Sequence, residues 1–507
     1  MSILNDIFSY FITQRLKAIE DFTKSPLEAQ HAIFKSLIEK GKTTAWGKEN
    51  GYSNIRTYDD YARLVPLQDY NSLKPFIERM MSGEANVLWP EAVSWFAKSS
   101  GTTDDKSKFI PISLDSLQDC HYRAGKDIYA LFYDRYNEAN LIDGQTLVLG
   151  GSHEVSKLNE KARFGDLSAV LMQNAPFWAE FKRTPSLDIA LMSNWEEKIE
   201  KMAQATVNQN ITNIMGVPTW TIVLIKRLFE MTGKDNLTDI WPELQLYVHG
   251  GVSFTPYHNL FNELIRSPQM HYMETYNASE GFFGIQDDSQ RKDMLLLLDH
   301  GIFYEFIPAE QIDDKGTQAV PLEGVKANVN YAVVISTNGG LWRYILGDTV
   351  KFTSMFPFRI EISGRTRHFI NAFGEEVIVE NAEKAIARVS EKLECIVSDF
   401  TAAPIYFSSA GNGAHEWVIE FEKAPFDIEH FTRELDGALQ SLNSDYEAKR
   451  QKDIALRMPV IHVLQQGTFY AWMKKRGKLG GQHKVPRLSN NREFVEDILE
   501  FSGADRQ

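Results

Sequence analysis

Apolar side chains recur at helical spacing through the first hundred residues. The clearest example follows Ser25, Pro26 and Glu28, which supply a helix cap, a first-turn proline and a capping acid, and it ends at Gly41. The apolar positions of this stretch are Ala29, Ile33, Phe34, Leu37 and Ile38. The pattern predicts a helix whose apolar stripe packs into a core, within a mainly helical first segment.

A different pattern begins near residue 145. Short apolar runs, most of them closed by Gly or Pro, follow one another, and helical stretches separate some of them. The runs are TLVLGG, ITNIMGV, LQLYVHGG, GIFYEFIP and YAVVIST. This arrangement is typical of α/β sheets, in which the loops that carry chemistry usually follow the carboxyl ends of strands.

The end of the chain shows a third pattern, in which helices and strands alternate around a smaller core. Its apolar positions are Val379, Ala382, Ile386, Val389 and Leu393 in a first helix, Trp417, Ile419 and Phe421 in a strand, Ile428, Phe431, Leu435, Leu439 and Leu442 in a second helix, and MPVIHVL in a further strand. We expect an α+β domain with one sheet and helices on one side of it. The predicted join is SGRTRH, residues 363–368, which gives an N-terminal domain over residues 1–364 and a C-terminal domain over residues 365–507.

Composition limits the classes of protein that remain. The chain has 507 residues, of which 43% are hydrophobic and 24% charged. Such a chain is long enough for two or three lobes, and it is not disordered, collagen-like or a coiled coil. Its 68 acidic and 54 basic residues give a formal net charge of -14. That excess of acids disfavours nucleic acid as a partner and favours a soluble cytoplasmic protein.

Cysteines and apolar stretches narrow the location further. Cys120 and Cys395 are too few for a disulfide framework, and we expect two buried thiols in a reducing compartment. The longest strongly apolar stretch, residues 294–298, is far shorter than the ~20 residues that span a bilayer. The N-terminal sequence MSILNDIFSYFITQRL lacks a small-residue cleavage site. We expect it to form an amphipathic helix packed on the body, with membrane attachment as the alternative.

Two short motifs suggest chemistry that their context excludes. GKTT at residues 41–44 is not a Walker A loop, because Ser36 stands where that loop needs its first glycine. HGG at residues 249–251 resembles an oxyanion loop, but no G-x-S-x-G elbow accompanies it. The histidines also lack the spacing of a built-in zinc site.

The segment KSSGTTDDKSK, from Lys98 to Lys108, is dense in hydrogen-bond donors. Hydroxyl groups and backbone N–H groups bind phosphate oxygens, and glycine lets the backbone approach them closely. The segment therefore predicts a phosphate-binding loop, with an ordinary Ser/Thr turn as the alternative.

Two further segments carry single acidic residues beside other functional groups. In ETYNASEG, residues 274–281, Tyr276 is suited to stack on a base and Glu280 to bind Mg²⁺, whereas the alternative is a polar connection with one buried tyrosine. In WRYILGD, residues 342–348, a hydrophobic strand ends at Asp348. That carboxylate is suited to accept hydrogen bonds from both ribose hydroxyls, and a simple turn residue is the alternative.

The ordered set SSGTT, HGG, TYNASEG, RYILGD and SGRTR resembles the adenylate-forming enzymes. Within them the whole chain resembles the bacterial branch of the auxin-responsive acyl-acid amido synthetases, the Gretchen Hagen family, with support from VPLQDYNSLKPFIERMMSGE and GKLGGQHKVPRL. The resemblance implies a large N-terminal adenylate-forming domain and a mobile C-terminal cap. It also implies that a carboxylic acid attacks the α-phosphate of MgATP, and that an amine, usually of an amino acid, then takes the acyl group and releases AMP.

The resemblance assigns residues to the nucleotide site. Its phosphate-binding loop is Ser99, Ser100, Gly101, Thr102 and Thr103. Gly250 and Gly251 are the glycine pair that lines the adenine pocket, and Tyr276 lies against the adenine. Around the rest of ATP the resemblance places Ser279 near the phosphates, Glu280 on Mg²⁺ and Asp348 on the ribose. Arg365 matches the arginine that follows the ribose-binding aspartate in the family's sequence.

Two assignments concern the chemical step and the acid. The late catalytic lysine of the superfamily matches either Lys478 or Lys484 in the glycine-rich segment KLGGQHKVP, with Lys478 slightly preferred and a solvated basic tail as the alternative. The acyl pocket is expected along residues 121–133, where Tyr122 and Arg123 are candidate substrate-binding residues and Arg123 is suited to pair with a carboxylate. That helix is equally well suited to core packing.

This chain departs from the family pattern at several positions. They are Asp104 and Asp105 in the first loop, Ile345 and Leu346 in the third motif, and Arg367 at the join. Two rivals remain beside amide formation. One is a ligase that passes the acyl group to coenzyme A; the other, for which Asp104 and Asp105 are the ground, is a nucleotide-binding protein without turnover. The acid, the amine and the oligomeric state stay open.

Overall fold

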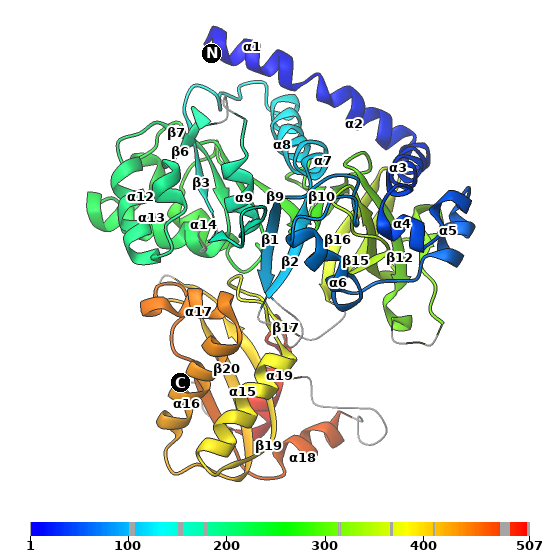
Figure 1. Ribbon diagram of the computed structural model, residues 1–507. Helices are drawn as coiled ribbons and strands as arrows, with labels where there is room; N and C mark the ends of the chain where they lie inside the picture. Colours follow the sequence, from blue (N-terminus) through cyan, green and yellow to red (C-terminus); the bar gives the residue numbers. More distant parts are fainter. Residues whose placement is uncertain are drawn as a thin grey trace.

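The computed structural model describes residues 2–100, 107–150, 156–176, 180–312, 314, 316–365, 369–408, 411–476 and 487–503. Figure 1 shows a large body, coloured blue to yellow-green, above a smaller one, coloured yellow to red. The fold class is α/β with a large N-terminal domain and a smaller C-terminal domain, as the sequence predicts.

Helices dominate the first hundred residues. They are α1 (Ile3–Ile12), α2 (Arg15–Lys24), α3 (Pro26–Gly41), α4 (Ala45–Glu49), α5 (Tyr58–Leu64) and α6 (Tyr70–Met81). The predicted helix is α3, which begins at Pro26, ends at Gly41 and buries Phe34, Leu37 and Ile38 in the core. The predicted apolar stripe is therefore confirmed.

The N-terminal segment packs on the body through one face of α1. The ring of Phe8 lies 5.9 Å from that of Tyr129 and 5.6 Å from that of Tyr133, both on α8 (Tyr122–Arg135). A second apolar face remains exposed to solvent, made by Ile3, Leu4, Ile7, Tyr10 and Phe11. The expected packing is confirmed, and the exposed face is an addition to it.

One mixed sheet of twelve strands forms the centre of the large domain within the described residues, in the order β13-β12-β14-β15-β16-β11-β10-β9-β8-β7-β3-β6. The parallel side consists of β3 (Gln145–Leu149), β6 (Arg183–Thr184), β7 (Ile211–Gly216), β8 (Leu246–Gly250) and β9 (His271–Ala278). The antiparallel side consists of β10 (Gly281–Ile285), β11 (Met294–Leu296), β12 (Ile302–Pro308), β13 (Val320–Pro321), β14 (Asn330–Thr337), β15 (Tyr344–Met355) and β16 (Phe358–Arg365). All five predicted strands are present.

Helices connect the parallel strands and cover them (Figure 1). They are α9 (Leu167–Gln173), α11 (Leu187–Ala190), α12 (Trp195–Thr206), α13 (Pro218–Thr232) and α14 (His258–Leu264), whereas α7 (Leu114–Ser116) and α8 precede β3 in the chain. Because the strands are parallel, Gly150, Gly216 and Gly250 all stand at the same carboxyl edge of the sheet. Ligands of open α/β sheets bind at this edge.

A small second sheet lies beside the large one. Its order is β2-β1-β5-β4, with β1 (Trp95–Ser100), β2 (Ser107–Ile112), β4 (Ser156–Lys157) and β5 (Arg163–Gly165). The strands β1 and β2 are antiparallel, and Ser99 pairs with Lys108. The predicted phosphate loop therefore joins two adjacent strands of this sheet.

The C-terminal domain is built on the three-stranded sheet β19-β20-β21. Its strands are β17 (Phe369–Ile370), β18 (Val377–Ile378), β19 (Ile396–Ile405), β20 (Ala414–Lys423) and β21 (Val460–Leu464), and its helices are α15 (Val379–Lys392), α16 (Ile428–Leu442), α17 (Ser444–Arg450), α18 (Thr468–Lys475) and α19 (Glu493–Ser502). The predicted helices and strands are confirmed, but the expectation of helices on one side is wrong. Trp417 packs with α15 and α16, whereas its neighbour Val418 packs with α18 and α19. The first eight residues of β20 are all buried, so both faces of the strand are covered.

A continuous apolar cluster joins the two domains. It contains Trp220 and Tyr257 from the large domain and Phe373 and Phe407 from the C-terminal domain. The hydroxyl of Tyr257 also donates to the carbonyl oxygen of Ala372 over 2.5 Å. The two domains therefore share buried surface as well as a chain connection.

Two sequence expectations concern location. Cys120 and Cys395 are buried free thiols, as expected. Burial raises the pKa of the Cys120 thiol to about 12. Among the described residues, no helix combines the length and the apolar character that crossing a bilayer requires.

Candidate active site

Asp348 and Tyr276 are brought together from distant strands. Asp348 lies on β15 and is 8% exposed, Tyr276 lies on β9 and is 5% exposed, and the tyrosine hydroxyl donates to Oδ2 of Asp348 over 2.9 Å. In the sheet order these strands are separated by β16, β11 and β10. Adjacent strands are about 4.8 Å apart, so a flat sheet would keep the two side chains far from each other. The sheet must curl to bring them into contact.

Glu280 follows Tyr276 in the short connection between β9 and β10. It is half-buried, as is Ser279 beside it. Burial raises the pKa of Glu280, the ammonium of Lys108 opposes this, and the carboxylates of Asp348 and Glu376 reinforce it. Three acidic residues and one lysine therefore act on the same space, and one of the acids, Glu376, comes from the C-terminal domain. This is the kind of oxygen-rich environment that a hard divalent cation stabilises.

The glycine pair at the end of β8 is required by close packing against β9. A Cβ atom on Gly250 would lie 2.6 Å from the carbonyl oxygen of Thr275 and 2.7 Å from its hydroxyl. Gly251 has a φ of +81°, in the region that favours glycine. Gly250 is paired with Thr275, so the glycine pair and Tyr276 occupy neighbouring strands. The structure thus places the two parts of the predicted adenine pocket side by side.

The first motif is only partly within the described residues. Ser99 and Ser100 end β1. Lys108 is the second residue of the return strand β2, and its ammonium lies 3.4 Å from the hydroxyl of Tyr344. The sequence analysis assigned no role to Lys108, although it closes the donor-rich segment. Gly101, Thr102, Thr103, Asp104 and Asp105 lie outside the described residues, as do Lys478, Lys484 and Arg367.

Arg365 ends β16, and its backbone is paired with that of Asp348. The arginine predicted to follow the ribose-binding aspartate is thus its neighbour across two strands. The other arginine of this region, Arg343, is buried and binds the carboxylate of Glu305 over 2.8 Å. It also donates to two backbone carbonyl oxygens, so its contacts are structural.

Tyr122 and Arg123 lie on α8 as predicted, but both use their polar groups within the protein. The hydroxyl of Tyr122 donates to the carbonyl oxygen of Leu171 over 2.9 Å. Arg123 donates to the carbonyl oxygen of Asp299 and to the carboxylate of Asp119, each over 2.5 Å. These contacts favour the packing alternative, and the substrate-binding role stays a prediction.

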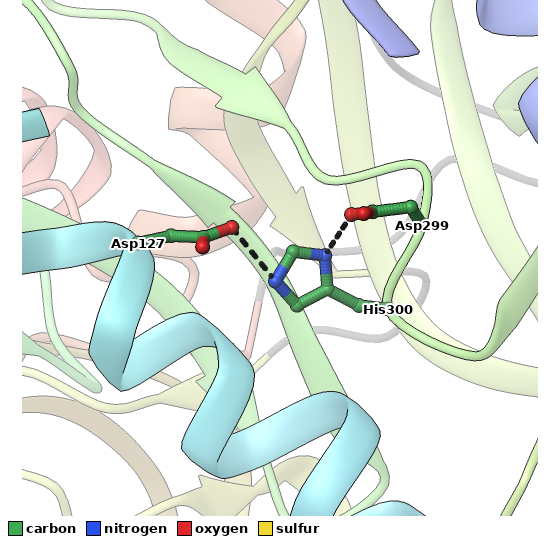
Figure 2. Close-up of side chains that lie close together, drawn as sticks. All are labelled: Asp127, Asp299 and His300. Atoms are coloured by element: carbon green, nitrogen blue, oxygen red, sulfur yellow. Dashed lines mark ion pairs between the residues drawn. The ribbon is translucent and has the colours of Figure 1, made fainter. Parts of the chain in front are cut away.

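A second group of charged residues, next to α8, was not found from the sequence. His300 is fully buried between two carboxylates, with Nε2 3.2 Å from Asp127 and Nδ1 3.0 Å from Asp299, as Figure 2 shows. Arg15 of α2 donates to both carboxylates, over 2.7 Å and 2.6 Å. Two carboxylates and an imidazole are a possible metal-ligand set. Here two anions already meet the guanidinium and the imidazole, so we interpret the group as a charge network that attaches α2 to the body.

Comparison with known proteins gives the same family along the whole chain. The GH3 family N-terminal domain matches residues 15–270, the GH3 family central domain residues 295–365, and the GH3 family C-terminal domain residues 380–493. Indole-3-acetic acid-amido synthetase GH3.3 of Arabidopsis thaliana is 22% identical over 95% of this chain and 92% of its own. Jasmonoyl–L-amino acid synthetase JAR6 of Nicotiana attenuata is 23% identical over 93% of this chain and 92% of its own.

Solved structures of adenylate-forming enzymes share the fold. The GH3.15 acyl acid amido synthetase in complex with 2,4-DB has a TM-score of 0.62 at 17% identity, over 96% of this chain and 95% of its own. A 2-hydroxyisobutyryl-CoA ligase has a TM-score of 0.59 at 12% identity, over 94% and 93%. The resemblance found from five ordered motifs is thus confirmed, and the chain belongs to the GH3 family, with the fold of the adenylate-forming enzymes.

Proposed function

We propose that this GH3 family chain is an acyl acid amido synthetase that uses ATP and Mg²⁺ to join a carboxylic acid to an amino acid. The single observation that carries the proposal is the pair Tyr276–Asp348 beside Glu280, at the edge of the sheet where the family's nucleotide residues are expected. The named relatives GH3.3 and JAR6 are amido synthetases, which supports the same reaction class here.

The residues have separable roles in the first half-reaction. Asp348 accepts from the ribose hydroxyls, and Tyr276, which donates to its Oδ2, fixes the orientation of that carboxylate. Ser99, Ser100, Gly101, Thr102, Thr103 and Ser279 supply phosphate donors, and Gly250 and Gly251 leave room for the base. Catalysis of the attack on the α-phosphate is then mainly positioning and charge stabilisation.

Glu280 is the proposed ligand of Mg²⁺, with Asp348 and Glu376 contributing negative potential. A bound Mg²⁺ supplies neutralisation of phosphate charge as pyrophosphate leaves. The half-buried position of Glu280 supports this role, because a carboxylate whose ionised form is destabilised by burial gains from a nearby cation.

The proposal also covers the catalytic lysine, the domain division and the location. Lys478 or Lys484 bridges the acyl carboxylate and the phosphate, and Arg365 is the nucleotide-site arginine that follows the ribose-binding Asp348 in the sequence. We place the domain division between residues 364 and 365, so that the C-terminal domain carries both lysines and reorients between the two half-reactions. Two buried free thiols support a cytoplasmic location.

The test is pyrophosphate release with MgATP across a panel of aromatic and aliphatic carboxylic acids. Each acid is run alone, with a pooled amino-acid mixture, and with coenzyme A. Release that depends on one class of acid, together with AMP release that rises with amino acids and ignores coenzyme A, is the expected result.

Thioester formation is the second candidate, because a 2-hydroxyisobutyryl-CoA ligase shares the fold. AMP release that requires coenzyme A and ignores amino acids would establish it instead. Persistent ATP binding with no pyrophosphate release for any acid would favour a nucleotide-binding protein without turnover.

A further inference from the structure

Two lysines flank a pair of stacked tryptophans at the border of the two domains. The indoles of Trp195 on α12 and Trp220 on α13 are 3.5 Å apart at an interplanar angle of 4°. The ammonium of Lys198 lies 4.4 Å from a ring centroid of Trp195. That of Lys449, on α17 of the C-terminal domain, lies 4.5 Å from a ring centroid of Trp220. Lys449 thus reaches the large domain from across the border.

Lys449 is buried without an anionic partner in the described part of the chain. Its exposed fraction is 7%, and no carboxylate of that part lies within ion-pair distance of it. Burial lowers the pKa of Lys449 to about 8, and the carboxylates of Asp445, Glu375 and Asp166 oppose this only from a longer range. Glu375 is itself occupied by His415 over 2.8 Å. An indole face compensates a buried ammonium only in part, so this site favours an added anion.

The ammonium of Lys449 stands at the ligand-binding edge of the large sheet. A Cβ atom placed on Gly374 would lie 3.3 Å from Nζ of Lys449 and 4.0 Å from Val217, the residue that follows β7. The same valine would lie 3.6 Å from a Cβ atom on Gly251. One valine side chain therefore separates Lys449 from the glycine pair of the predicted adenine pocket.

Lys449 lies on the opposite side of the glycine pair from Tyr276 and Glu280, the residues proposed for adenylation. Tyr276 and Glu280 belong to β9 and its connection, whereas Lys449 meets the end of β7, two strands away. Two strand spacings are about 10 Å. In the proposed function the acyl carboxylate meets the α-phosphate beside Glu280, on the β9 side, and on that basis the anion at Lys449 belongs to a different molecule. Since the C-terminal domain carries Lys449, movement of that domain would make and remove this contact.

We propose that Lys449 is the anchor for a carboxylate of the acceptor amino acid in the second half-reaction. This assignment rests on the proposed function, which brings an amino acid to this edge. Lys198, fully buried beside the same indole pair, adds positive potential to the subsite. The shared chemistry is a carboxylate; it belongs either to the α-carboxyl group or to an acidic side chain of the acceptor.

The variant that tests the anchor is Lys449→Met, which removes the charge and keeps an unbranched apolar stem against Trp220. The acid is the one that gives the highest pyrophosphate release in the panel, and the acceptors are L-alanine, L-glutamate and L-alaninamide. Acid-dependent pyrophosphate release without acceptor reports adenylation alone. Amide formation at varied acceptor concentration reports the second half-reaction.

We expect the KM for the acceptor to rise roughly 10- to 100-fold, the range of a lost charged hydrogen bond, while adenylation is spared. If the KM rises for alanine and glutamate but not for alaninamide, Lys449 binds the α-carboxylate. If the KM rises for glutamate alone, Lys449 binds the side-chain carboxylate. An unchanged KM for both, or an equal loss for alaninamide, overturns the proposal.

The matched control is Lys226→Met. Lys226, on α13, also lies near an aromatic ring of the C-terminal domain, with its ammonium 5.8 Å from the ring centroid of Phe407. If weaker attachment of the C-terminal domain were the cause, both variants would lose acceptor affinity alike. Absence of acid-dependent adenylation in the unmodified protein would overturn the proposed function itself, and the anchor with it. Intact adenylation with an unchanged acceptor KM would overturn the anchor alone.

Discussion

At the scale of single residues, the hydroxyl of Tyr276 is what connects the nucleotide side chains to each other. Its hydrogen bond to Asp348 joins strands that are not adjacent in the sheet. We expect Tyr276→Phe to keep the ring, which packs 4.8 Å from Phe283, and to lose the orientation of the carboxylate. The KM for ATP should rise roughly 5- to 10-fold, as for one hydrogen bond of about 1–1.5 kcal/mol.

Tyr304→Phe is the matched control for that substitution. Tyr304 is also fully buried, and within the described residues its hydroxyl has no hydrogen-bond partner. Its removal should leave the KM for ATP unchanged and leave stability equal or slightly higher. Equal ATP kinetics in the two variants would contradict the role of the Tyr276–Asp348 contact.

Glu280 is predicted to matter through its charge. Glu280→Gln keeps the size and removes the anion, so adenylation should fall roughly 100-fold and should need a higher Mg²⁺ concentration for half-maximal rate. Pyrophosphate release measured against Mg²⁺ concentration gives both quantities. Glu274→Gln is the control on the same segment, because burial raises the pKa of Glu274 to about 7 and leaves it partly neutral already. If both variants respond alike to Mg²⁺, the ligand is another residue.

The sequence identified residues whose neighbours along the chain reveal their chemistry. Glu280 and the glycine pair end or follow a strand, as their motifs indicate. The strand expected to end at Asp348 instead runs on to Met355, so this carboxylate lies within β15. Lys449 and His300 could not be found in this way. Trp220 is 229 residues from Lys449 and Asp127 is 173 residues from His300, and only the fold brings these partners close. A buried cation is recognised only when the surface that buries it is known.

At the scale of helices and strands, the periodicity of apolar residues predicted most elements, because one face of each element is buried and the other is exposed to solvent. The C-terminal sheet is the exception, since Trp417 and Val418 are consecutive residues that enter two different apolar clusters. An alternating pattern was visible at Trp417, Ile419 and Phe421, but the intervening positions are buried as well. The second cover, α18 and α19, therefore escaped the prediction.

Two glycine-to-alanine substitutions should change the stability in opposite directions, one at the end of β8 and one inside α8. A Cβ atom on Gly250 would meet the backbone of Thr275 at 2.6 Å, so Gly250→Ala should force β8 from β9, cost about 1–3 kcal/mol and weaken ATP binding. Gly125 lies inside α8, and a Cβ atom there would meet nothing within 4 Å. Gly125→Ala should stabilise the helix by about 0.5–1 kcal/mol. Urea unfolding measures both, and a stabilised Gly250→Ala protein would contradict the close packing.

At the scale of the whole molecule, the two-domain plan was predicted from the change of pattern along the chain, but the way the domains meet was not. The shared apolar cluster and the reach of Lys449 to Trp220 depend on residues that are ordinary helix positions in the sequence. Strand order was equally hidden, because neighbours such as β11 and β16 are far apart along the chain. These pairings join residues far apart in sequence, and the local pattern of apolar and polar residues does not predict them.

The free energy of unfolding of the whole molecule should depend on pH through the titration of His300. Burial alone would lower the pKa of His300, but the contacts with Asp127 and Asp299 outweigh it and raise the pKa above the usual value. A raised folded pKa means that the stabilisation is complete below the unfolded value of about 6.5 and is lost as pH rises through the folded value. Each unit of difference is worth about 1.4 kcal/mol. Arg15 keeps its charge throughout, so it does not contribute to this loss.

His300→Asn removes this imidazole and keeps the other titrating side chains. The pKa of His121, which burial and the neighbouring His300 lower to about 4, lies well below the pH interval of the test. Urea unfolding at pH 6.5 and at pH about 9 should show the unmodified protein losing more stability than the variant over that interval. The variant should be the less stable at the lower pH, because Asp127 and Asp299 then share only Arg15. Parallel losses in the two proteins would mean that His300 is neutral in the folded state and that Arg15 alone attaches α2 to the body.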